Sequence, residues 1–140
     1  LVEKYMKRCL AYGMFPGFFS HEASGRSHYF QRPELYSRDR PLFRKYVPLC
    51  KRVAEAGWQP VTGARSSNPE VYVERFGDGL LTVFNDSAEP QQTTITWPEA
   101  GAGVSRELVS GRTVTWHAGS VRMSLPPEDV AALVLDTDEQ

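Results

Sequence analysis

Hydrophobic and polar positions alternate with helical spacing over the first part of the chain. Between residues 2 and 10 apolar side chains recur every three or four positions, with charged residues between them. The apolar positions are Val2, Tyr5, Met6, Cys9 and Leu10. This pattern predicts an amphipathic helix that ends at Gly13.

A second stretch of helical spacing lies farther along. Its apolar stripe consists of Phe43, Tyr46, Val47, Cys50, Val53 and Ala54. Asp39 is the expected N-cap, Pro41 fits the first turn because its missing N–H needs no partner there, and Gly57 is expected to give a left-handed exit. Pro48 lies inside the pattern, which predicts a kink or a division into two helices.

The segment between these helices divides into two parts. Residues 14–19 are short, apolar and aromatic, and they predict a brief buried strand that turns into a loop. Residues 20–38 are polar and rich in Ser, Arg and His. A loop of this length inside a compact unit usually has a function, so we expect one here.

After Trp58 the period of the pattern changes from helical to twofold. Residues 71–76 and 80–85 flank Gly77-Asp78-Gly79, which is a strong signal for a short hairpin. Further strands are predicted at 92–97, 106–109, 112–117, 120–125 and 130–135, separated by Gly- and Pro-containing turns. About seven strands of this kind are typical of an antiparallel β-sandwich.

Charge supports a boundary near Trp58. Residues 1–58 contain 11 Lys and Arg against 5 Asp and Glu, whereas residues 59–140 contain 5 against 12. A single strand between two helices needs neighbouring strands on both edges. We therefore predict an α+β fragment: residues 1–58 as two helices and a short strand whose neighbouring strands come from preceding sequence, and residues 59–140 as a carboxy-terminal sandwich domain.

Several classes of function find no support in the sequence. The formal net charge of −1 gives no general attraction to nucleic acid or to an anionic membrane, and no apolar run reaches the roughly 20 residues of a membrane span. His21-Glu22 lacks the further His of a zinc-protease helix, since Gly25 occupies that position. No phosphate loop or dinucleotide fingerprint is present, so neither a metal nor a cofactor is predicted.

Carbohydrate binding is the chemistry that the aromatic residues suggest. Sugar rings stack their C–H faces on aromatic side chains, and Glu22 is the acid that a barrel would present to substrate. The candidate binding residues are Phe15, His21, Glu22, His28 and Tyr29. Core packing of the aromatic residues and a surface location for Glu22 are the alternatives. Trp97 and Trp116 lie in predicted strands, and an exposed pair would instead form a carbohydrate-binding surface.

Cysteine and glycosylation signals are few. Cys9 and Cys50 each fall on the apolar stripe of a predicted helix, where a thiol usually behaves as a small buried hydrophobe, and a disulfide between them is the alternative. Asn85-Asp86-Ser87 matches the N-glycosylation sequon.

Several segments resemble glycoside hydrolases. Residues 11–19, 38–48 and 56–62 look like the last strand and helix of barrel glycosidases, which implies that residues 1–58 are the end of a (β/α)8 barrel. Residues 81–87, 107–111, 121–127 and 130–135 are similar to the carboxy-terminal sandwich of α-amylases and α-galactosidases. The resemblance implies the end of an enzyme that acts on O-glycosidic bonds, with its catalytic acids on earlier barrel strands, so no catalytic residue is assigned.

The resemblance also implies how the chain would behave. Carbohydrate would be bound through the parent enzyme, and the sandwich would pack against a missing amino-terminal barrel and stabilise it, with the 20–38 loop at the cleft rim. Alone, the chain is expected to be inactive and to expose the apolar faces of both helices. A non-catalytic carbohydrate-binding module or a structural sandwich is the alternative.

Overall fold

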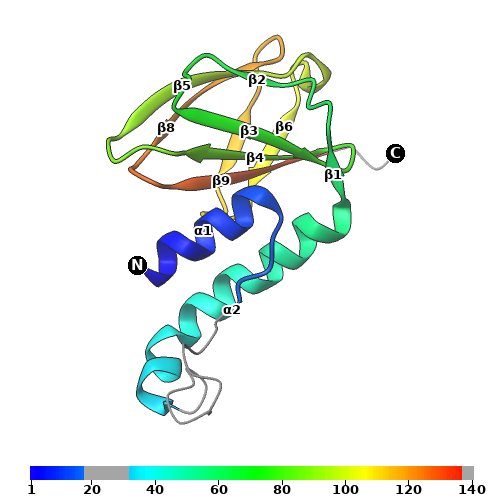
Figure 1. Ribbon diagram of the computed structural model, residues 1–140. Helices are drawn as coiled ribbons and strands as arrows, with labels where there is room; N and C mark the ends of the chain where they lie inside the picture. The colour runs from blue at the N-terminus through cyan, green and yellow to red at the C-terminus, as the bar shows by residue number, and fades with distance from the viewer. Residues whose placement is uncertain (18–31, 137–140) are drawn as a thin grey trace.

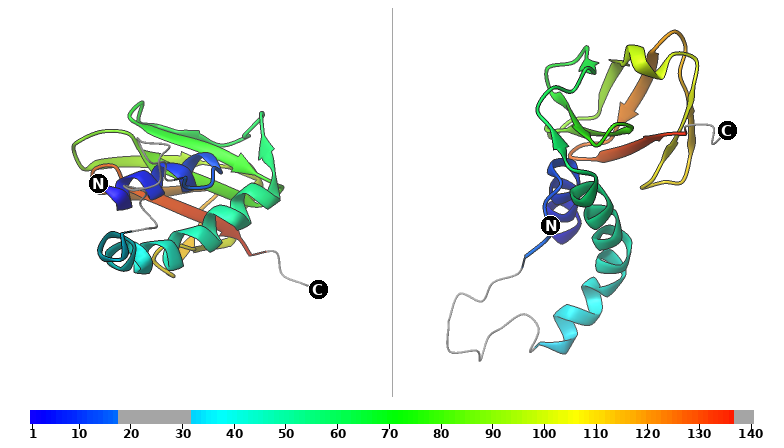
Figure 2. Two further views of the ribbon diagram at one scale, coloured as in Figure 1. Left: turned by 60° about the horizontal axis from the view of Figure 1, so that its bottom comes forward. Right: turned by 90° about the vertical axis from the view of Figure 1, so that its right-hand side faces the viewer.

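The computed structural model describes residues 1–17 and 32–136. They form three stacked layers, which are two helices, a six-stranded sheet and a three-stranded sheet (Figure 1). The helices cover one face of the larger sheet, and the smaller sheet covers the other face (Figure 2). The predicted order of two helices followed by an antiparallel sandwich is therefore confirmed.

The described residues contain two α-helices, nine strands and one short 3-10 helix. The helices are α1 (Val2–Tyr12) and α2 (Pro33–Ala56), and the 3-10 helix η2 spans Pro98–Ala100. The strands are β1 (Trp58–Gln59), β2 (Arg65–Ser66), β3 (Val71–Phe76), β4 (Leu80–Asn85), β5 (Gln91–Thr96), β6 (Val104–Glu107), β7 (Thr113–Thr115), β8 (Ser120–Leu125) and β9 (Val130–Leu135). The two-residue strands β1 and β2 were not predicted, because two residues carry no measurable alternation.

Helix α1 ends where the sequence predicts. Gly13 adopts the left-handed conformation, with φ of 66°, and its N–H donates to the carbonyl oxygen of Leu10 at 3.2 Å. A Cβ added to Gly13 would lie 2.5 Å from the ring of Phe76. Glycine is required here both by the backbone conformation and by the close approach of the sheet.

Helix α2 is longer than predicted. It begins at Pro33, which occupies the first turn, so Asp39 is not an N-cap but a buried residue inside the helix. Its carboxylate accepts two hydrogen bonds from the guanidinium of Arg38. Pro48 does not divide the helix, which is continuous to Ala56, and the bend visible in Figure 1 lies in its first turns. Gly57 ends the helix with a positive φ of 87°, but its ψ of 125° lies outside the left-handed helical conformation that was predicted for the exit.

The predicted strand over residues 14–19 is wrong for the part that the structure describes. Residues 14–17 have no strand conformation, and Met14 and Phe15 are 52% and 57% exposed. The backbone hydrogen-bonds to α1 instead, because the N–H of Met14 donates to Cys9 at 2.8 Å and that of Gly17 to the hydroxyl of Tyr5 at 2.9 Å. These bonds satisfy donors that a strand would pair with a neighbour.

The larger sheet has the order β1-β3-β4-β9-β6-β7, and the smaller one β2-β5-β8. The hairpin of β3 and β4, strand β8 and strand β9 have the predicted bounds, whereas β5, β6 and β7 are shifted or shorter. Every residue of β4 is buried. Its alternate side chains face the helices on one side and the smaller sheet on the other, which explains a nearly continuous apolar sequence in an antiparallel strand.

Candidate functional site at the interface between helices and sandwich

The candidate carbohydrate-binding residues lie mostly outside the described part of the chain. His21, Glu22, His28 and Tyr29 fall within residues 18–31 and therefore stay a prediction. Phe15 is described and exposed. The structure accordingly neither groups nor separates the five candidates.

The alternative of an exposed tryptophan pair is wrong. Trp97 and Trp116 are both completely buried between the two sheets, with ring centroids 5.7 Å apart in an edge-to-face arrangement. The indole N–H of Trp116 donates to the hydroxyl of Ser105 at 2.9 Å. These side chains form the centre of the sandwich core, so they cannot stack on a sugar from solvent.

The helices bury their apolar faces on the larger sheet, which corrects the expectation that these faces are exposed. The buried residues of this second core come from α1, α2 and three strands. They are Met6, Cys9, Leu10, Ala11, Tyr46, Cys50, Val53, Phe76, Leu80, Phe84 and Val130. Side chains from both sides of Trp58 thus share one core, and their burial supplies most of the stabilisation of this interface.

Two hydrogen bonds fix the helices against this core. The hydroxyl of Thr82, buried in β4, donates to the carbonyl oxygen of Ala11 at 2.6 Å, which satisfies an acceptor that the end of α1 leaves unpaired. The hydroxyl of Tyr46 donates to the carboxylate of Glu3 at 3.0 Å and links α2 to α1. Burial, together with this bond, raises the pKa of Tyr46 well above its usual range.

The two cysteines are buried and free, as the helical pattern indicates. Burial raises the pKa of the Cys50 thiol to about 11, and the neighbouring Cys9 contributes to this rise. Because the thiolate is the reactive form, neither thiol should react with iodoacetamide at about pH 8 in the folded protein, and both should react in denaturant. Alkylation followed by mass measurement checks this, and rapid native modification would contradict the burial of both residues.

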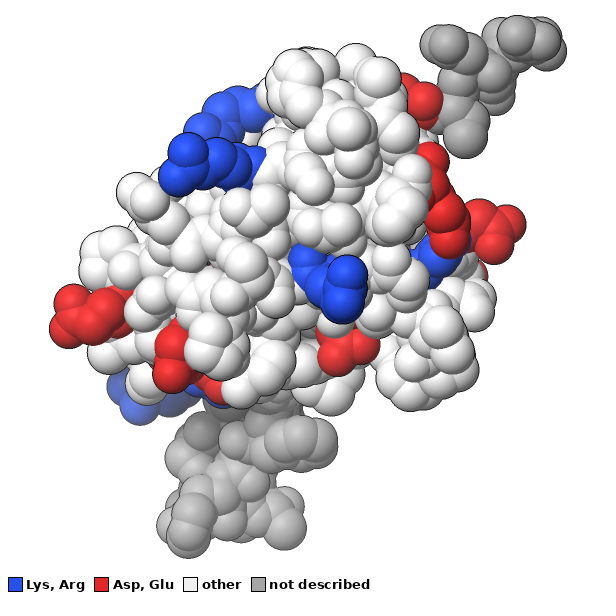
Figure 3. Space-filling view, turned by 90° about the horizontal axis from the view of Figure 1, so that it is seen from above, with Lys and Arg blue, Asp and Glu red and all other residues white. Residues whose placement is uncertain are grey.

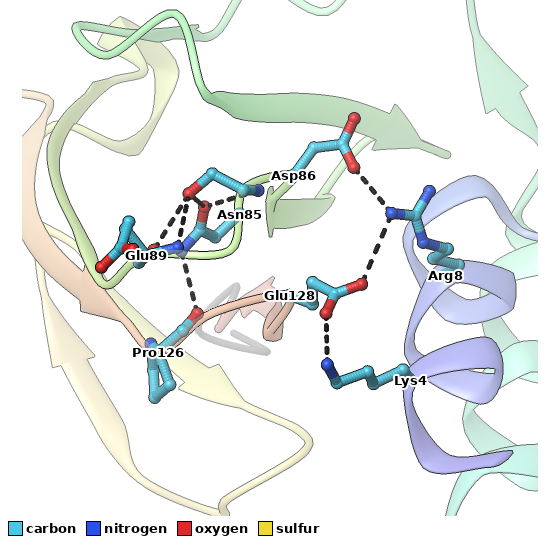
Figure 4. Close-up of polar contacts among 8 residues, drawn as sticks. Lys4, Arg8, Asn85, Asp86, Glu89, Pro126 and Glu128 are labelled. Atoms are coloured by element: carbon cyan, nitrogen blue, oxygen red, sulfur yellow. Dashed lines mark hydrogen bonds and ion pairs between the residues drawn. The ribbon is translucent and has the colours of Figure 1, made fainter. Parts of the chain in front are cut away.

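Basic residues of α1 meet acidic residues from two turns of the sandwich. Lys7 pairs with Asp129 at 2.6 Å, and Arg8 pairs with Asp86 at 2.9 Å and with Glu128 at 3.7 Å. Figure 4 shows Lys4 and Arg8 reaching from α1 to Glu128 and Asp86. The opposite net charges of the two parts of the sequence are therefore brought together at this interface. Exposed pairs of this kind give orientation more than stability.

The stability of the protein should decrease with acid partly through Glu128. Hydrogen bonding to Lys4 holds the pKa of Glu128 below its usual value of 4.5, and Arg8 adds to the effect. A carboxyl group whose pKa is lower in the folded state than in the unfolded state stabilises the protein at pH values above its unfolded-state pKa. This contribution is lost as the pH falls through the folded-state pKa.

Melting temperatures measured between about pH 6 and pH 3 check this expectation. Glu128→Gln should show a smaller loss on acidification than the wild type, whereas Glu70→Gln, at an exposed site without an ion pair in the described structure, should follow the wild type. Equal acid sensitivity in all three proteins would contradict the role of Glu128.

Asn85 links the same two turns of the sandwich through hydrogen bonds of its buried side chain. It is fully buried, and its amide nitrogen donates to the carbonyl oxygens of Glu89 at 2.8 Å and Pro126 at 2.9 Å (Figure 4) and to that of Leu125 at 3.2 Å. Its carbonyl oxygen accepts from the N–H and the hydroxyl of Ser87. The sequon Asn85-Asp86-Ser87 therefore serves a structural role, since its amide nitrogen is enclosed by the fold.

A second group of hydrogen bonds, around Glu107, holds the loop after β6 in place. Glu107 is 3% exposed, and its carboxylate accepts hydrogen bonds from the N–H groups of Val109, Ser110 and Ala132 at 2.9, 2.7 and 3.0 Å. The hydroxyl of Ser110 also donates to it. Its oxygens are occupied by the loop and by β9, so Glu107 has a structural role at the edge of a cleft of about 760 Å³.

Neither a metal centre nor a membrane helix is found in the described residues. No group of three or more His, Cys, Asp or Glu side chains lies close enough together there to hold a metal ion. No described helix is long and apolar enough to span a bilayer.

Solved structures provide the comparison that relates this arrangement to known proteins. An α-amylase from Geobacillus thermoleovorans, complexed with acarbose, superposes on 98% of this chain with a TM-score of 0.62 and 13% sequence identity. An Anoxybacillus α-amylase superposes on 99% with a TM-score of 0.55 and 15% identity. The protein AmyP, in complex with maltose, superposes on 83% with a TM-score of 0.55 and 18% identity.

The chain has the fold of the carboxy-terminal region of α-amylases. It covers 33%, 33% and 24% of the length of the three matched chains. No protein-family model and no curated protein matches the sequence. At these identities the likeness concerns the fold, and both helices of this α-amylase-like fold are included in the match because nearly the whole chain superposes.

Some residues of the interface were not predicted from the sequence. Thr82 lies within the apolar run of β4, and Asn85 is the last residue of that strand, directly before a turn, where a polar residue usually faces solvent. A polar residue within an otherwise apolar central strand is the signal for Thr82, whereas Asn85 gives no comparable signal because two of its three acceptors, Leu125 and Pro126, lie 40 and 41 residues later.

Proposed function

We propose that this chain is the carboxy-terminal part of a glycoside hydrolase acting on O-glycosidic bonds. Residues 59–140 form the sandwich, and residues 1–58 contain two helices that form the end of the catalytic barrel. The sandwich covers these helices. The observation that carries the proposal is the match of nearly the whole chain, helices included, to about a third of each of two α-amylase chains.

The construction of the interface supports a stabilising role for the sandwich. The apolar faces of α1 and α2 pack on β4 and β9, ion pairs orient α1, and Thr82 caps its last turn. This surface holds two helices against a rigid sheet. The opposite side of α1 and the segment after it leave Tyr5, Met14 and Phe15 exposed. Under the proposal these side chains face the barrel.

The candidate carbohydrate-binding residues belong to the same proposal. Phe15, His21, Glu22, His28 and Tyr29 would lie at the rim of the catalytic cleft with the 20–38 loop, and the catalytic acids would come from the barrel. The chain alone would then bind sugar weakly and hydrolyse none, because the paired carboxylates of a glycosidase are not assembled.

The test compares the 140-residue protein with a longer polypeptide that includes the coding sequence preceding it. The longer protein should hydrolyse aryl glycosides and the 140-residue protein should not. Leu10→Asp, which places a charge in the helix–sheet core, should lower the temperature of thermal inactivation of the longer enzyme, whereas Tyr72→Ala at an exposed position should not. Enzyme-like hydrolysis by the 140-residue protein, or preceding sequence that encodes no barrel, would overturn the proposal.

A further inference from the structure

The sandwich has two free strand edges that face each other. β7 is the last strand of the larger sheet and β8 is the last strand of the smaller one. The two strands are consecutive in the chain and are joined near their turn by the bridge between His117 and Ser120. From this turn they diverge into different sheets, so the space between them widens toward Arg112 and Ser124.

This space is a continuous groove. A cavity of about 300 Å³ is lined by residues 112–114 of one strand and 122–124 of the other. It shares Arg112, Met123 and Ser124 with the cleft of about 760 Å³ at the open end of the sandwich. Val114 and Met123 face the core between the sheets, so the floor of the groove is apolar.

The backbone of β8 directs unpaired groups into this groove. In an antiparallel strand, the N–H and C=O groups of one residue point to the same side and those of the next residue to the other. The N–H and C=O of Ser120 bond to His117, on the side away from β5. The same groups of Arg122 and Ser124 therefore point away from β5, where no strand is paired with them.

The charge of the part of the groove between β7 and β8 is opposite to that of the sandwich as a whole, whereas the adjoining cleft is also lined by Glu107 and Asp129. Residues 59–140 contain 5 Lys and Arg against 12 Asp and Glu. Arg112 and Arg122 are both exposed beside the groove, and neither takes part in an ion pair within residues 1–17 and 32–136. Figure 3, which views the molecule from above, shows a group of basic side chains at its upper left and further basic and acidic side chains around the rest of this face.

We propose that this groove binds an extended, acidic peptide segment, which adds to the free edge of β8 as a further antiparallel or parallel strand. The backbone of the segment pairs with Arg122 and Ser124. Its alternate side chains rest on Val114 and Met123, and the intervening acidic side chains lie beside Arg112 and Arg122. The mode is strand addition, in which backbone pairing gives affinity and alternate side chains give specificity. This inference does not depend on the proposed function.

The probe for the experiment is a capped hexapeptide in which glutamate alternates with valine, added to the 140-residue protein. Its binding should slow amide hydrogen exchange at Arg122 and Ser124 and leave the opposite edge of the same sheet, at Arg65, unchanged. A matched peptide with lysine in place of glutamate should bind at least tenfold more weakly. A glutamate–valine peptide that is N-methylated at alternate positions, and therefore cannot pair along a strand, should give no protection.

Variants of the protein separate the groove from its surroundings. Arg122→Glu should weaken binding of the glutamate–valine peptide about tenfold, because an attraction becomes a repulsion. Arg65→Glu makes the same charge change at the exposed end strand β2 and should change binding less than twofold. Both side chains are exposed, so folding is expected to persist and is checked by the melting temperature.

Three outcomes would overturn the proposal. The first is unchanged exchange at Arg122 and Ser124 with saturating peptide. The second is equal loss of affinity in Arg65→Glu and Arg122→Glu. The third is protection of the β8 edge without peptide that increases with protein concentration, which would identify a second copy of the chain as the occupant.

Discussion

Phe84→Ala should lower the free energy of unfolding by about 3–5 kcal/mol, the range for removing a buried phenylalanine. The ring is 1% exposed in the core between the helices and the larger sheet. It contacts Tyr12 edge-to-face, with centroids 6.2 Å apart, and the guanidinium of Arg8 lies 5.4 Å from its centroid. The substitution thus removes packing and leaves a cavity under α1.

Chemical denaturation with circular dichroism and fluorescence measures this effect. Tyr72→Ala is the matched control, since Tyr72 is the cross-strand partner of Phe84 and is 47% exposed, and it should cost less than about 1 kcal/mol. Helix and sandwich signals should be lost together in Phe84→Ala. Comparable costs for both substitutions would contradict the shared core.

Asn85→Ala should lower the free energy of unfolding by about 2–4 kcal/mol, because three carbonyl oxygens lose their donor in a buried environment. Asn85→Asp has the same shape but replaces the donor by an acceptor, which faces those carbonyl oxygens. The carboxylate would be destabilised there, so this variant should be least stable near neutral pH and partly recover as the pH falls toward 4.

Denaturation curves at pH 7 and about pH 4 distinguish the two Asn85 variants. Asn68→Ala is a suitable control, because the amide of Asn68 also donates to another segment, at Gln91 and Gln92 of β5, but is partly exposed, and it should cost about 1 kcal/mol. A stability of Asn85→Asp at pH 7 equal to that of the wild type would show that the amide donor is not needed.

Sequence pattern was sufficient where one strong local signal determined the structure. The hairpin of β3 and β4 follows from alternating apolar residues around Gly77-Asp78-Gly79, and the positions of Thr93, Ile95 and Trp97 on the buried face of β5 and its end follow from the twofold period. Most of the two helical stripes was also identified correctly, because their buried residues lie three and four positions apart, although Tyr5 of the predicted first stripe is exposed and Ala11 is buried instead.

The errors arose where distant contacts decide the outcome. Apolar residues 14–17 suggested a strand, but hydrogen bonds to α1 hold this segment and leave Met14 and Phe15 exposed. Asp39 is of a residue type that often caps the start of a helix, yet α2 begins at Pro33, six residues earlier. The partner of each helical stripe could not be identified either, since periodicity shows that a face is buried but not what covers it.

The candidate site was less predictable than the fold. Thr82 acts through a backbone partner that is 71 residues away, and Glu107 binds the N–H of Ala132, 25 residues away, besides those of its own loop. A sequence gives the residue types but not these separations. The tryptophans show the same difficulty, because the sequence allowed both burial and display on a sheet face, and only the packing of Trp97 against Trp116 distinguishes the two.

The position of β9 in the larger sheet imposes an order on biosynthesis. This strand lies between β4 and β6, although it follows both of them in the chain. Before Val130 and the residues after it are translated, no strand lies between β4 and β6, and α1 lacks part of the surface on which it packs. The nascent polypeptide must therefore leave apolar surface of the sheet uncovered until β9 leaves the exit tunnel, and that interval is when chaperone binding or aggregation would compete with folding.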